Sequence, residues 1–370
     1  MAHPFDNCVY LFSMEQRFAA QNLQAHPTAF QTRWQAPSNI ALIKYWGKKS
    51  PQTPLNASIS FTLANAVTQT QVRFSPKEEE DQKLSFSIQF EGVVKPDFRP
   101  KIQRFFDHIL PYQPFLTAYH IDIESKNTFP HSSGIASSAS SMAALAACLV
   151  DFEAQLAPMS EEHRLLKTSF LARLGSGSAS RSTQGPVMVW GKHPVVSNSS
   201  DHWATPADNI HPIFTDFCDT ILLIDKGQKQ VSSSLGHKLM HNHPYAEQRF
   251  DQANNHLRDL LPILESGDLE AFIPIVEKEA LHLHAMMMTS DPYFILMKPN
   301  TLQVIEHIWA FRKDSKLPIS FTLDAGANVH VLYPNSVAKE VSNFIDNQLL
   351  SFCEQRQLLH DRVGTGIKKY

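Results

Sequence analysis

The chain has 370 residues, of which 43% are hydrophobic and 19% are charged, a composition that excludes a disordered or fibrous protein. Because this length exceeds the size at which a single hydrophobic core usually stops growing, we expect two lobes. The formal net charge of -3, from 33 basic and 36 acidic side chains, provides no long-range attraction toward nucleic acid or anionic lipid. Any anionic ligand must therefore be held by a local site.

The cysteine spacing and the N-terminus indicate the cellular setting. Cys8, Cys148, Cys218 and Cys353 are far apart, without a Cys-x-x-Cys pair, which argues against a disulfide framework and a zinc site. The first residues lack the basic start and apolar run of a signal peptide, and no window reaches the roughly 18 apolar residues of a membrane span. We therefore expect a cytoplasmic protein with neither membrane nor nucleic-acid partners.

The hydrophobic pattern predicts strands and helices along most of the chain. After a possible short amphipathic helix at 15–23, strands are expected at 36–43, 58–63, 68–74, 119–125, 220–225 and just before Asp324, and helices at 101–110, 142–150, 244–264 and 269–288. The charged run at 77–83 reads as a solvated turn between two strands. A Ser-, Asn-, Asp- and Pro-rich run at 191–212 is the best inter-lobe connection. We divide the chain into an N-terminal extension, 1–33, and two domains, 34–205 and 206–370.

A loop of small residues leads directly into a helix within 127–141. Gly134 permits a close backbone approach, and the N-terminus of the helix offers unpaired N–H groups and a partial positive charge. This combination favours phosphate binding, although a Walker loop is absent. A serine-rich helix cap without any ligand is the alternative.

Lysines follow the apolar strand at 36–43. Strand ends deliver side chains to ligand sites, and the point charge of a lysine suits phosphate oxygens. Lys44 is flanked by Ile43, Tyr45 and Trp46, which favours a functional role, whereas Lys49 reads as an ordinary surface lysine.

Two further segments contain an arginine and an acid that suit catalysis. In the segment 175–182, hydroxyls and glycines surround Arg181, whose planar fork of donors matches a carboxylate or a phosphate. Asp324 stands at the end of an apolar strand before a Gly turn, which favours a catalytic carboxylate. A flexible surface turn and a turn-capping aspartate are the respective alternatives.

In this order and spacing, the four segments resemble the diphosphomevalonate decarboxylases of the GHMP kinase superfamily. The resemblance runs from about Trp34 to about Gly366, and the string 39–48, Asn-Ile-Ala-Leu-Ile-Lys-Tyr-Trp-Gly-Lys, is its most specific part. It implies a two-lobed α+β fold of the GHMP kinase type. Each lobe should contain a mainly antiparallel sheet packed against helices, with the active site in the cleft between the lobes.

The resemblance also implies roles for particular residues. Asp324 should be the catalytic base near the 3-hydroxyl of the substrate, Arg181 should bind the departing carboxylate, and Lys44 should orient both the substrate and Asp324. With Arg181, the substrate-binding positions are Tyr45, Lys48, Ser137, Ser176 and Ser178. The positions expected around ATP and its Mg2+ are Ser132, Ser133, Gly134, Ile135, Ala136, Ser137, Ser138 and Ser234, the last standing where the family usually has Thr.

The implied reaction is the ATP-dependent decarboxylation of mevalonate 5-diphosphate to isopentenyl diphosphate, in the mevalonate pathway of isoprenoid biosynthesis. The resemblance also implies a homodimer. Within the same fold, a phosphomevalonate decarboxylase and a mevalonate 3-kinase remain open. A non-catalytic nucleotide-binding protein is an alternative of another class, and so is a serine hydrolase using Ser178 or Ser180, although no Gly-x-Ser-x-Gly elbow is present.

Two histidine pairs, His241/His243 and His282/His284, invite a metal interpretation. Alternate positions do not share one face of a helix. We therefore expect no metal held by protein side chains.

Overall fold

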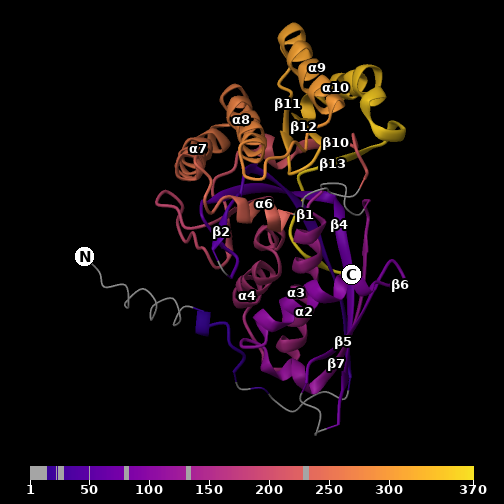
Figure 1. The fold of residues 1–370 in the computed structure, drawn as a ribbon. Helices are drawn as coiled ribbons and strands as arrows, with labels where there is room; N and C mark the ends of the chain where they lie inside the picture. Colours follow the sequence, from indigo (N-terminus) through magenta and orange to yellow (C-terminus); the bar gives the residue numbers. More distant parts are fainter. Residues whose placement is uncertain are drawn as a thin grey trace, which may run out of the picture.

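The computed structural model describes residues 15–21, 23, 29–49, 51–78, 83–130, 135–227 and 233–370. Its two larger sheets and their helices form two lobes, and the long strands β1 (Phe30–Ile43) and β4 (Ser58–Pro76) extend from the first lobe toward the second (Figure 1). The predicted two-lobed α+β architecture is confirmed.

The sheet of the first lobe has the main order β14-β1-β4-β7-β5-β6, with β8 paired to β4 and β9 paired to β8. Its neighbours are antiparallel except for β5 and β7, which run parallel. A separate hairpin is made by β2 (Lys48–Lys49) and β3 (Thr53–Pro54). The other strands of the large sheet are β5 (Ser85–Phe90), β6 (Val93–Val94), β7 (Tyr119–Asn127), β8 (Val187–Trp190), β9 (Ala204–Pro206) and β14 (Lys368–Lys369).

The strand β4 corrects one prediction, because the two strands expected at 58–63 and 68–74 form a single strand. The residues between them do not turn. Instead, the carboxylate of Asp361, from the second lobe, accepts backbone N–H groups of Ala64, Asn65 and Ala66 at 3.0, 2.8 and 2.7 Å. These N–H donors are satisfied while the chain stays extended. The pairing of β1 with β4 accommodates this segment through shifts in register.

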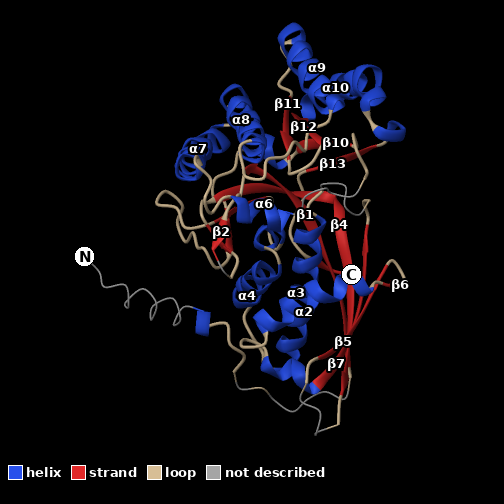
Figure 2. Cartoon of the chain, viewed as in Figure 1, coloured by secondary structure: helices blue, strands red, loops and turns tan. Residues whose placement is uncertain are grey.

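Three helices cover one face of the first sheet: α2 (Arg99–Ile109), α3 (Ser137–Leu156) and α4 (Glu161–Gly175) (Figure 2). The middle of α3 is buried on all sides, which explains why 142–150 is apolar without amphipathic spacing. The predicted helices at 101–110 and 142–150 are confirmed, although α3 is considerably longer.

The second lobe is built on an antiparallel sheet of order β11-β12-β10-β13. Helices pack around it and against the long strands of the first lobe, where Phe61 of β4 lies among Phe214, Phe217 and Phe272. The predicted helices at 244–264 and 269–288 are confirmed. The elements are α5 (Pro212–Thr215), β10 (Phe217–Leu222), α6 (Ser233–Leu239), α7 (Ala246–Ser266), α8 (Leu269–Met288), α9 (Pro299–Ser315), β11 (Ser320–Leu323), β12 (Val329–Pro334), α10 (Ala338–Phe344) and β13 (Leu358–Arg362).

The N-terminal extension does not form the helix expected at 15–23. Glu15 and Gln16 are helical, and the chain then turns. Phe18 is fully buried and stacks on Phe170 of α4, so the apolar side chain is used for insertion into the lobe rather than for one face of a helix.

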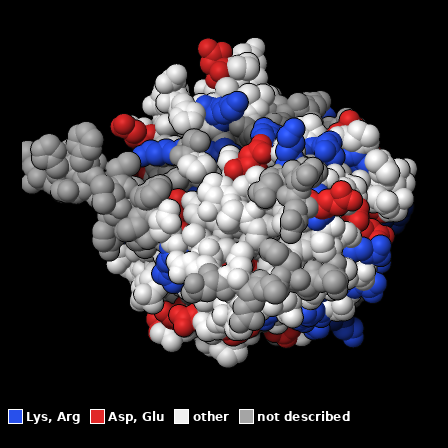
Figure 3. Space-filling view, turned by 90° about the horizontal axis from the view of Figure 1, so that it is seen from below, with Lys and Arg blue, Asp and Glu red and all other residues white. Residues whose placement is uncertain are grey.

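The surface carries intermixed positive and negative side chains on the face seen from below (Figure 3), in line with the small net charge. Cys148, Cys218 and Cys353 are free thiols, and Cys8 lies outside the described residues. Of the helices in the described ranges, none has the length and apolar character needed to cross a membrane.

Candidate active site

Two predicted catalytic side chains meet at the junction of the lobes. Lys44 follows β1, and Asp324 follows β11. The Lys44 Nζ atom lies 3.5 Å from Oδ1 of Asp324 and donates a hydrogen bond of 2.6 Å to the carbonyl oxygen of Ala41. The side chain of Lys44 is 2% exposed and that of Asp324 is 27% exposed. The carboxylate is therefore accessible to a ligand, while the lysine forms part of the wall behind it.

Helix α8 supports both members of this pair. Oε2 of Glu279 accepts the backbone N–H of Lys44 at 2.9 Å, and Nε2 of His284 donates to the carbonyl oxygen of Asp324 at 3.1 Å. Burial lowers the pKa of the Lys44 ammonium, against the opposing influence of Asp324 and Glu279. Burial also lowers the pKa of His284 to about 4, so this imidazole is neutral near pH 7 and can donate from Nε2.

Arg181 lies in the short 3-10 helix η3 (Gly177–Ser182), which is buried rather than a mobile surface turn. Its guanidinium donates to the hydroxyl of Ser60 at 2.5 Å and to that of Ser58, and Nη2 approaches Oδ1 of Asn39 at 3.5 Å. Burial lowers the pKa of Arg181 to about 10, while the charge of Asp324 opposes the shift. The arginine thus keeps its charge at neutral pH and is held by neutral partners.

Tyr45 packs between the two lobes. Its ring meets the Trp190 indole edge-on at 4.7 Å and the His237 imidazole at 4.3 Å between centroids. Its hydroxyl is buried and has no hydrogen-bond partner among the described residues. A Cβ atom on Gly177 would lie 2.9 Å from this hydroxyl and 2.6 Å from Trp190. A glycine is therefore needed there for η3 to approach Tyr45.

Lys48 belongs to a group of three positive side chains that we call the cation cluster: Lys48, Arg104 and Lys238. The pKa of Lys48 is lowered by burial and then by the positive charges of Arg104 and Lys238. The Nζ atom of Lys48 donates to Oε1 of Gln52 at 2.8 Å. Because the positive charges of Arg104 and Lys238 disfavour the charged form of Lys48, a polyanion bound near Lys48 would offset their influence.

The start of α3 provides a second anion-binding feature. Ala136, immediately before the helix, has a left-handed φ of 37°, and Ser38 fastens the preceding residue by donating to the carbonyl oxygen of Ile135 at 2.8 Å. Lys101 of α2 donates to the hydroxyl of Ser138 at 2.6 Å. The N–H groups at the start of α3, of which that of Ala139 bonds to the carbonyl oxygen of Ala136 at 2.7 Å, therefore lie next to a lysine, which suits a phosphate.

The remaining predicted positions fall into two groups. Ser176 and Ser178 flank the start of η3, where the carbonyl of Ser178 accepts a hydrogen bond of 3.1 Å from Nδ2 of Asn39. Ser132, Ser133 and Gly134 lie outside the described residues. Ser234 lies in α6, but its side chain is not described. Helix α6 lies against the segment 44–49, which we call the lysine loop, because Nδ1 of His237 accepts the backbone N–H of Gly47 at 2.9 Å.

Two family models match the chain in succession. The diphosphomevalonate decarboxylase-like N-terminal domain matches residues 36–201, and the mevalonate 5-diphosphate decarboxylase C-terminal domain matches residues 220–366. The chain belongs to the diphosphomevalonate decarboxylase family.

Individual relatives of this family match over most of their length. A diphosphomevalonate decarboxylase from Ganoderma lucidum is 27% identical over 345 residues, which cover 86% of this chain and 82% of the relative. A phosphomevalonate decarboxylase from Haloferax volcanii is 26% identical, over 78% of this chain and 84% of the relative. A solved structure described as MDDEF in complex with MVAPP, AMPPCP and magnesium is 28% identical with a TM-score of 0.78, covering 92% of this chain and 99% of the other.

Several side chains around the candidate active site were not identified from the sequence. Lys101 and Arg104 lie three residues apart on α2, a spacing that places both on one helix face and could have singled them out. Lys238 and Glu279 offered no comparable signal, because only the packing of α6 and α8 against the lysine loop brings them to the site.

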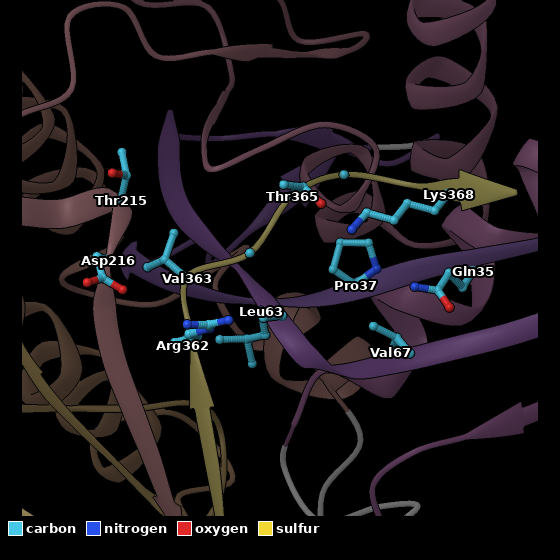
Figure 4. A pocket seen from close by; sticks show the side chains of 13 residues that line it. Gln35, Pro37, Leu63, Val67, Thr215, Asp216, Arg362, Val363, Thr365 and Lys368 are labelled. Carbon is cyan, nitrogen blue, oxygen red and sulfur yellow. The ribbon is translucent and has the colours of Figure 1, made fainter. Parts of the chain in front are cut away.

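A cavity of about 280 Å³ lies away from these residues and contains none of the predicted site positions. Its wall is formed by β1, β4, Thr215, Asp216 and the segment 362–368 (Figure 4). The charged groups in this wall, including Arg362 and Lys368, are exposed at the surface. The predicted decarboxylase residues do not use this cavity.

A histidine-carboxylate group does occur, and of the histidine pairs considered from the sequence it includes only His282. His256 of α7 joins Glu279 and His282 of α8, and their candidate ligand atoms lie within 4.8 Å of one another. Both oxygens of Glu279 already accept hydrogen bonds, from Arg249 at 3.2 and 2.6 Å, from His256 at 2.6 Å and from the Lys44 backbone at 2.9 Å. The Glu279 carboxylate is therefore satisfied, whereas Nδ1 of His282 is buried without a hydrogen-bond partner among the described residues, and the absence of a protein-held metal stays a prediction.

Proposed function

We propose that this protein is a carboxy-lyase that uses ATP to convert mevalonate 5-diphosphate into isopentenyl diphosphate, ADP, phosphate and carbon dioxide. The observation that carries the proposal is the meeting of Lys44 and Asp324, at 3.5 Å, beside Arg181 at the lobe junction of a chain in this family. An acid for the alcohol, an arginine for the carboxylate and a lysine that orients the acid are the groups such a reaction needs.

Asp324 accepts the proton of the tertiary 3-hydroxyl as that oxygen attacks the terminal phosphorus of ATP. Its partly exposed carboxylate can reach a substrate, and Lys44 and His284 restrict its orientation through the side chain and the backbone respectively. The base is therefore held in position before the substrate arrives.

Arg181 binds the carboxylate of the phosphorylated intermediate. When the phosphate leaves with its electron pair, positive charge develops at the tertiary carbon. The electrons of the bond to the carboxylate then form the new carbon-carbon double bond, and carbon dioxide is released. Because Arg181 is held by Ser58, Ser60 and Asn39, it can orient the departing group without an acidic side chain neutralising it by direct contact.

The cation cluster binds the diphosphate of the substrate. Three positive charges match a group that carries several negative charges. Tyr45, Ser137, Ser176 and Ser178 complete the set of substrate-binding positions, and the buried Tyr45 hydroxyl, which has no partner among the described residues, is available to a ligand.

ATP binds at the start of α3, with its phosphates against the segment 132–138 and Ser234. The fit is supported by the helix N-terminus and by Lys101 beside Ser138. The Mg2+ that accompanies ATP would be held by the phosphate oxygens, in line with the expectation of no metal held by protein side chains. When bound, Mg2+ would neutralise phosphate charge during the transfer.

The direct test is to supply ATP, Mg2+ and mevalonate 5-diphosphate and to measure ADP and carbon dioxide together. Equal amounts of both products are expected. The same assay with mevalonate 5-phosphate and with mevalonate separates the phosphomevalonate decarboxylase and the 3-kinase of the same fold. ADP without carbon dioxide would identify a kinase. ATP binding without ADP from any of the three substrates would identify a non-catalytic protein.

The serine hydrolase alternative is not favoured by the geometry. Ser180 is fully buried, and its hydroxyl donates to the carbonyl oxygen of Gly177 at 2.8 Å. We further propose that the protein is a cytoplasmic homodimer and that it acts in isoprenoid biosynthesis. The boundary between its two domains is proposed to lie near residue 205. Light scattering of the purified protein tests the dimer.

A further inference from the structure

The N-terminal extension closes over a buried arginine of the first lobe. Phe18 is fully buried and stacks on Phe170, with 4.5 Å between ring centroids. The backbone N–H of Ala20 donates to the carbonyl oxygen of Tyr112 at 2.8 Å. These contacts place Glu15 against the last turn of α4, near the described start of the chain in Figure 1.

Glu15 is the carboxylate that pairs with Arg173. Its Oε1 atom lies 3.3 Å from Nη2 of Arg173 and 2.9 Å from Nδ1 of His202, and its Oε2 atom accepts the hydroxyl of Tyr112 at 2.8 Å. The side chain of Arg173 is 0% exposed. The partners His202, Tyr112 and Arg173 lower the pKa of Glu15 despite the opposing influence of burial, so the carboxylate is ionised at neutral pH.

Arg173 uses other donors on a segment that carries a predicted substrate-binding residue. Its Nη1 atom donates to the carbonyl oxygen of Pro51 at 2.8 Å, and Pro51 lies in the turn between β2 and β3. Lys48 of the cation cluster is in β2. Nε of Arg173 donates to the carbonyl oxygen of His202 at 3.0 Å. Because the guanidinium is one rigid plane, its hydrogen bonds on different sides are geometrically linked.

We infer that Glu15 is a positioning residue for substrate binding: it holds Arg173, Arg173 holds Pro51, and the hairpin thereby presents Lys48 to the diphosphate. The inference rests on the proposed function, since it takes Lys48 as a ligand of the substrate. Removing the carboxylate leaves a buried guanidinium without its ion-pair partner, which is strongly unfavourable. The guanidinium must then shift, and its bond to Pro51 weakens.

The test compares Glu15→Gln with the unchanged enzyme in steady-state kinetics. We expect the KM for mevalonate 5-diphosphate to rise about three- to tenfold, with kcat and the KM for ATP changed less than about twofold, because only ground-state placement of one ligand is altered. In a Lys48→Ala background the same substitution should have no further effect on KM. This loss of additivity is the mark of action through Lys48.

A second measurement does not depend on turnover. Backbone hydrogen exchange without substrate should become faster in Glu15→Gln at residues 48–54 and stay unchanged in α7 and α8. Glu161→Gln is the matched control, because Glu161 forms an exposed ion pair with Arg164 on the same lobe, and it should leave both KM and exchange unchanged.

Three results would overturn the inference. They are unchanged KM and exchange in Glu15→Gln, an equal effect of Glu15→Gln with and without Lys48, and faster exchange throughout the first lobe together with a loss of kcat. If the unchanged enzyme fails to act on mevalonate 5-diphosphate, the proposed function is wrong. The exchange measurement then still decides whether Glu15 orders the hairpin.

Discussion

At the lobe junction, Lys44 and Arg181 interact with the acid Asp324, whereas at the hairpin Lys48 feels the positive charges of Arg104 and Lys238. The charges at the junction are oriented by both lobes, because Glu279 of α8 reaches across to the backbone of Lys44, while His284 of the same helix supports Asp324 within the second lobe. The hairpin instead gathers like charges that a ligand must neutralise. The comparison suggests that the first region determines the rate of the chemistry and the second determines substrate affinity.

The largest expected effect tests the reacting end. Asp324→Asn preserves size and hydrogen bonding but cannot take a proton, so kcat should fall on the order of 10²- to 10⁴-fold. ATP binding, measured by calorimetry, should be retained. Asp122→Asn is the control, because Asp122 is 44% exposed on β7. A kcat within about tenfold of the unchanged enzyme would contradict the role of Asp324 as the base.

The second prediction concerns Arg181, which we propose binds the carboxylate of the substrate. Arg181→Ala removes a charged hydrogen bond of about 1.5 to 3 kcal/mol, so kcat/KM should fall about 10- to 150-fold. The exposed Arg258, in an ion pair with the adjacent Asp259, supplies the control variant Arg258→Ala. Thermal melting of both variants checks that they fold. Unchanged catalytic efficiency in a folded Arg181→Ala enzyme would remove Arg181 from the mechanism.

The third prediction concerns the hairpin, where a substitution should change the affinity for the substrate rather than the rate of the reaction. Lys48→Ala should raise the KM for mevalonate 5-diphosphate about tenfold while kcat changes little, because one charge-assisted contact to the diphosphate is lost. The neighbouring exposed residue provides a matched variant, Lys49→Ala, with no expected effect. Steady-state kinetics at two salt concentrations makes the measurement. A selective loss of kcat in Lys48→Ala would contradict the idea that the hairpin determines substrate affinity and the lobe junction determines the rate.

The smallest effect is on pH dependence. The pKa of Lys48 lies below its ordinary value of 10.5. Because Lys48 then loses its positive charge before the pH reaches that value, the KM for mevalonate 5-diphosphate should begin to rise at a lower pH than 10.5. Lys238→Ala removes a neighbouring positive charge, which raises the pKa of Lys48 and moves the rise in KM to higher pH. The profile of Lys192→Ala should match that of the unchanged enzyme. A shift to lower pH in Lys238→Ala would have the wrong sign for a cation cluster.

The parts predicted from the sequence are those with a local signature. Lys44 and Asp324 each follow an apolar run, so the end of a strand could be inferred from neighbouring residues. The helix at 142–150 was recognisable as a continuous run of small and apolar side chains, but the burial of α3 on all sides was not predicted. The helix α8 could be bounded because it starts beside Asp268, whose carboxylate caps its first turn.

The parts not predicted depend on contacts between distant segments. No local pattern indicates that Asp361 will keep residues 64–66 extended, or that Glu279 will bind the backbone of Lys44. The extension was assigned no chemistry for the same reason, since the importance of Glu15 appears only when Arg173, far along the chain, is buried beneath it. Arg181 shows the intermediate case: its motif was recognisable, but its burial among serines was not.

The pairing of β14 with β1 has a consequence for biosynthesis. Trp34 and Gln35 are opposite Lys369 and Lys368. One edge of the first sheet is therefore paired by residues that are translated after the second lobe. A nascent chain paused between the lobes would expose that edge on β1. We expect the sheet of the first lobe to be completed only after translation has passed residue 369.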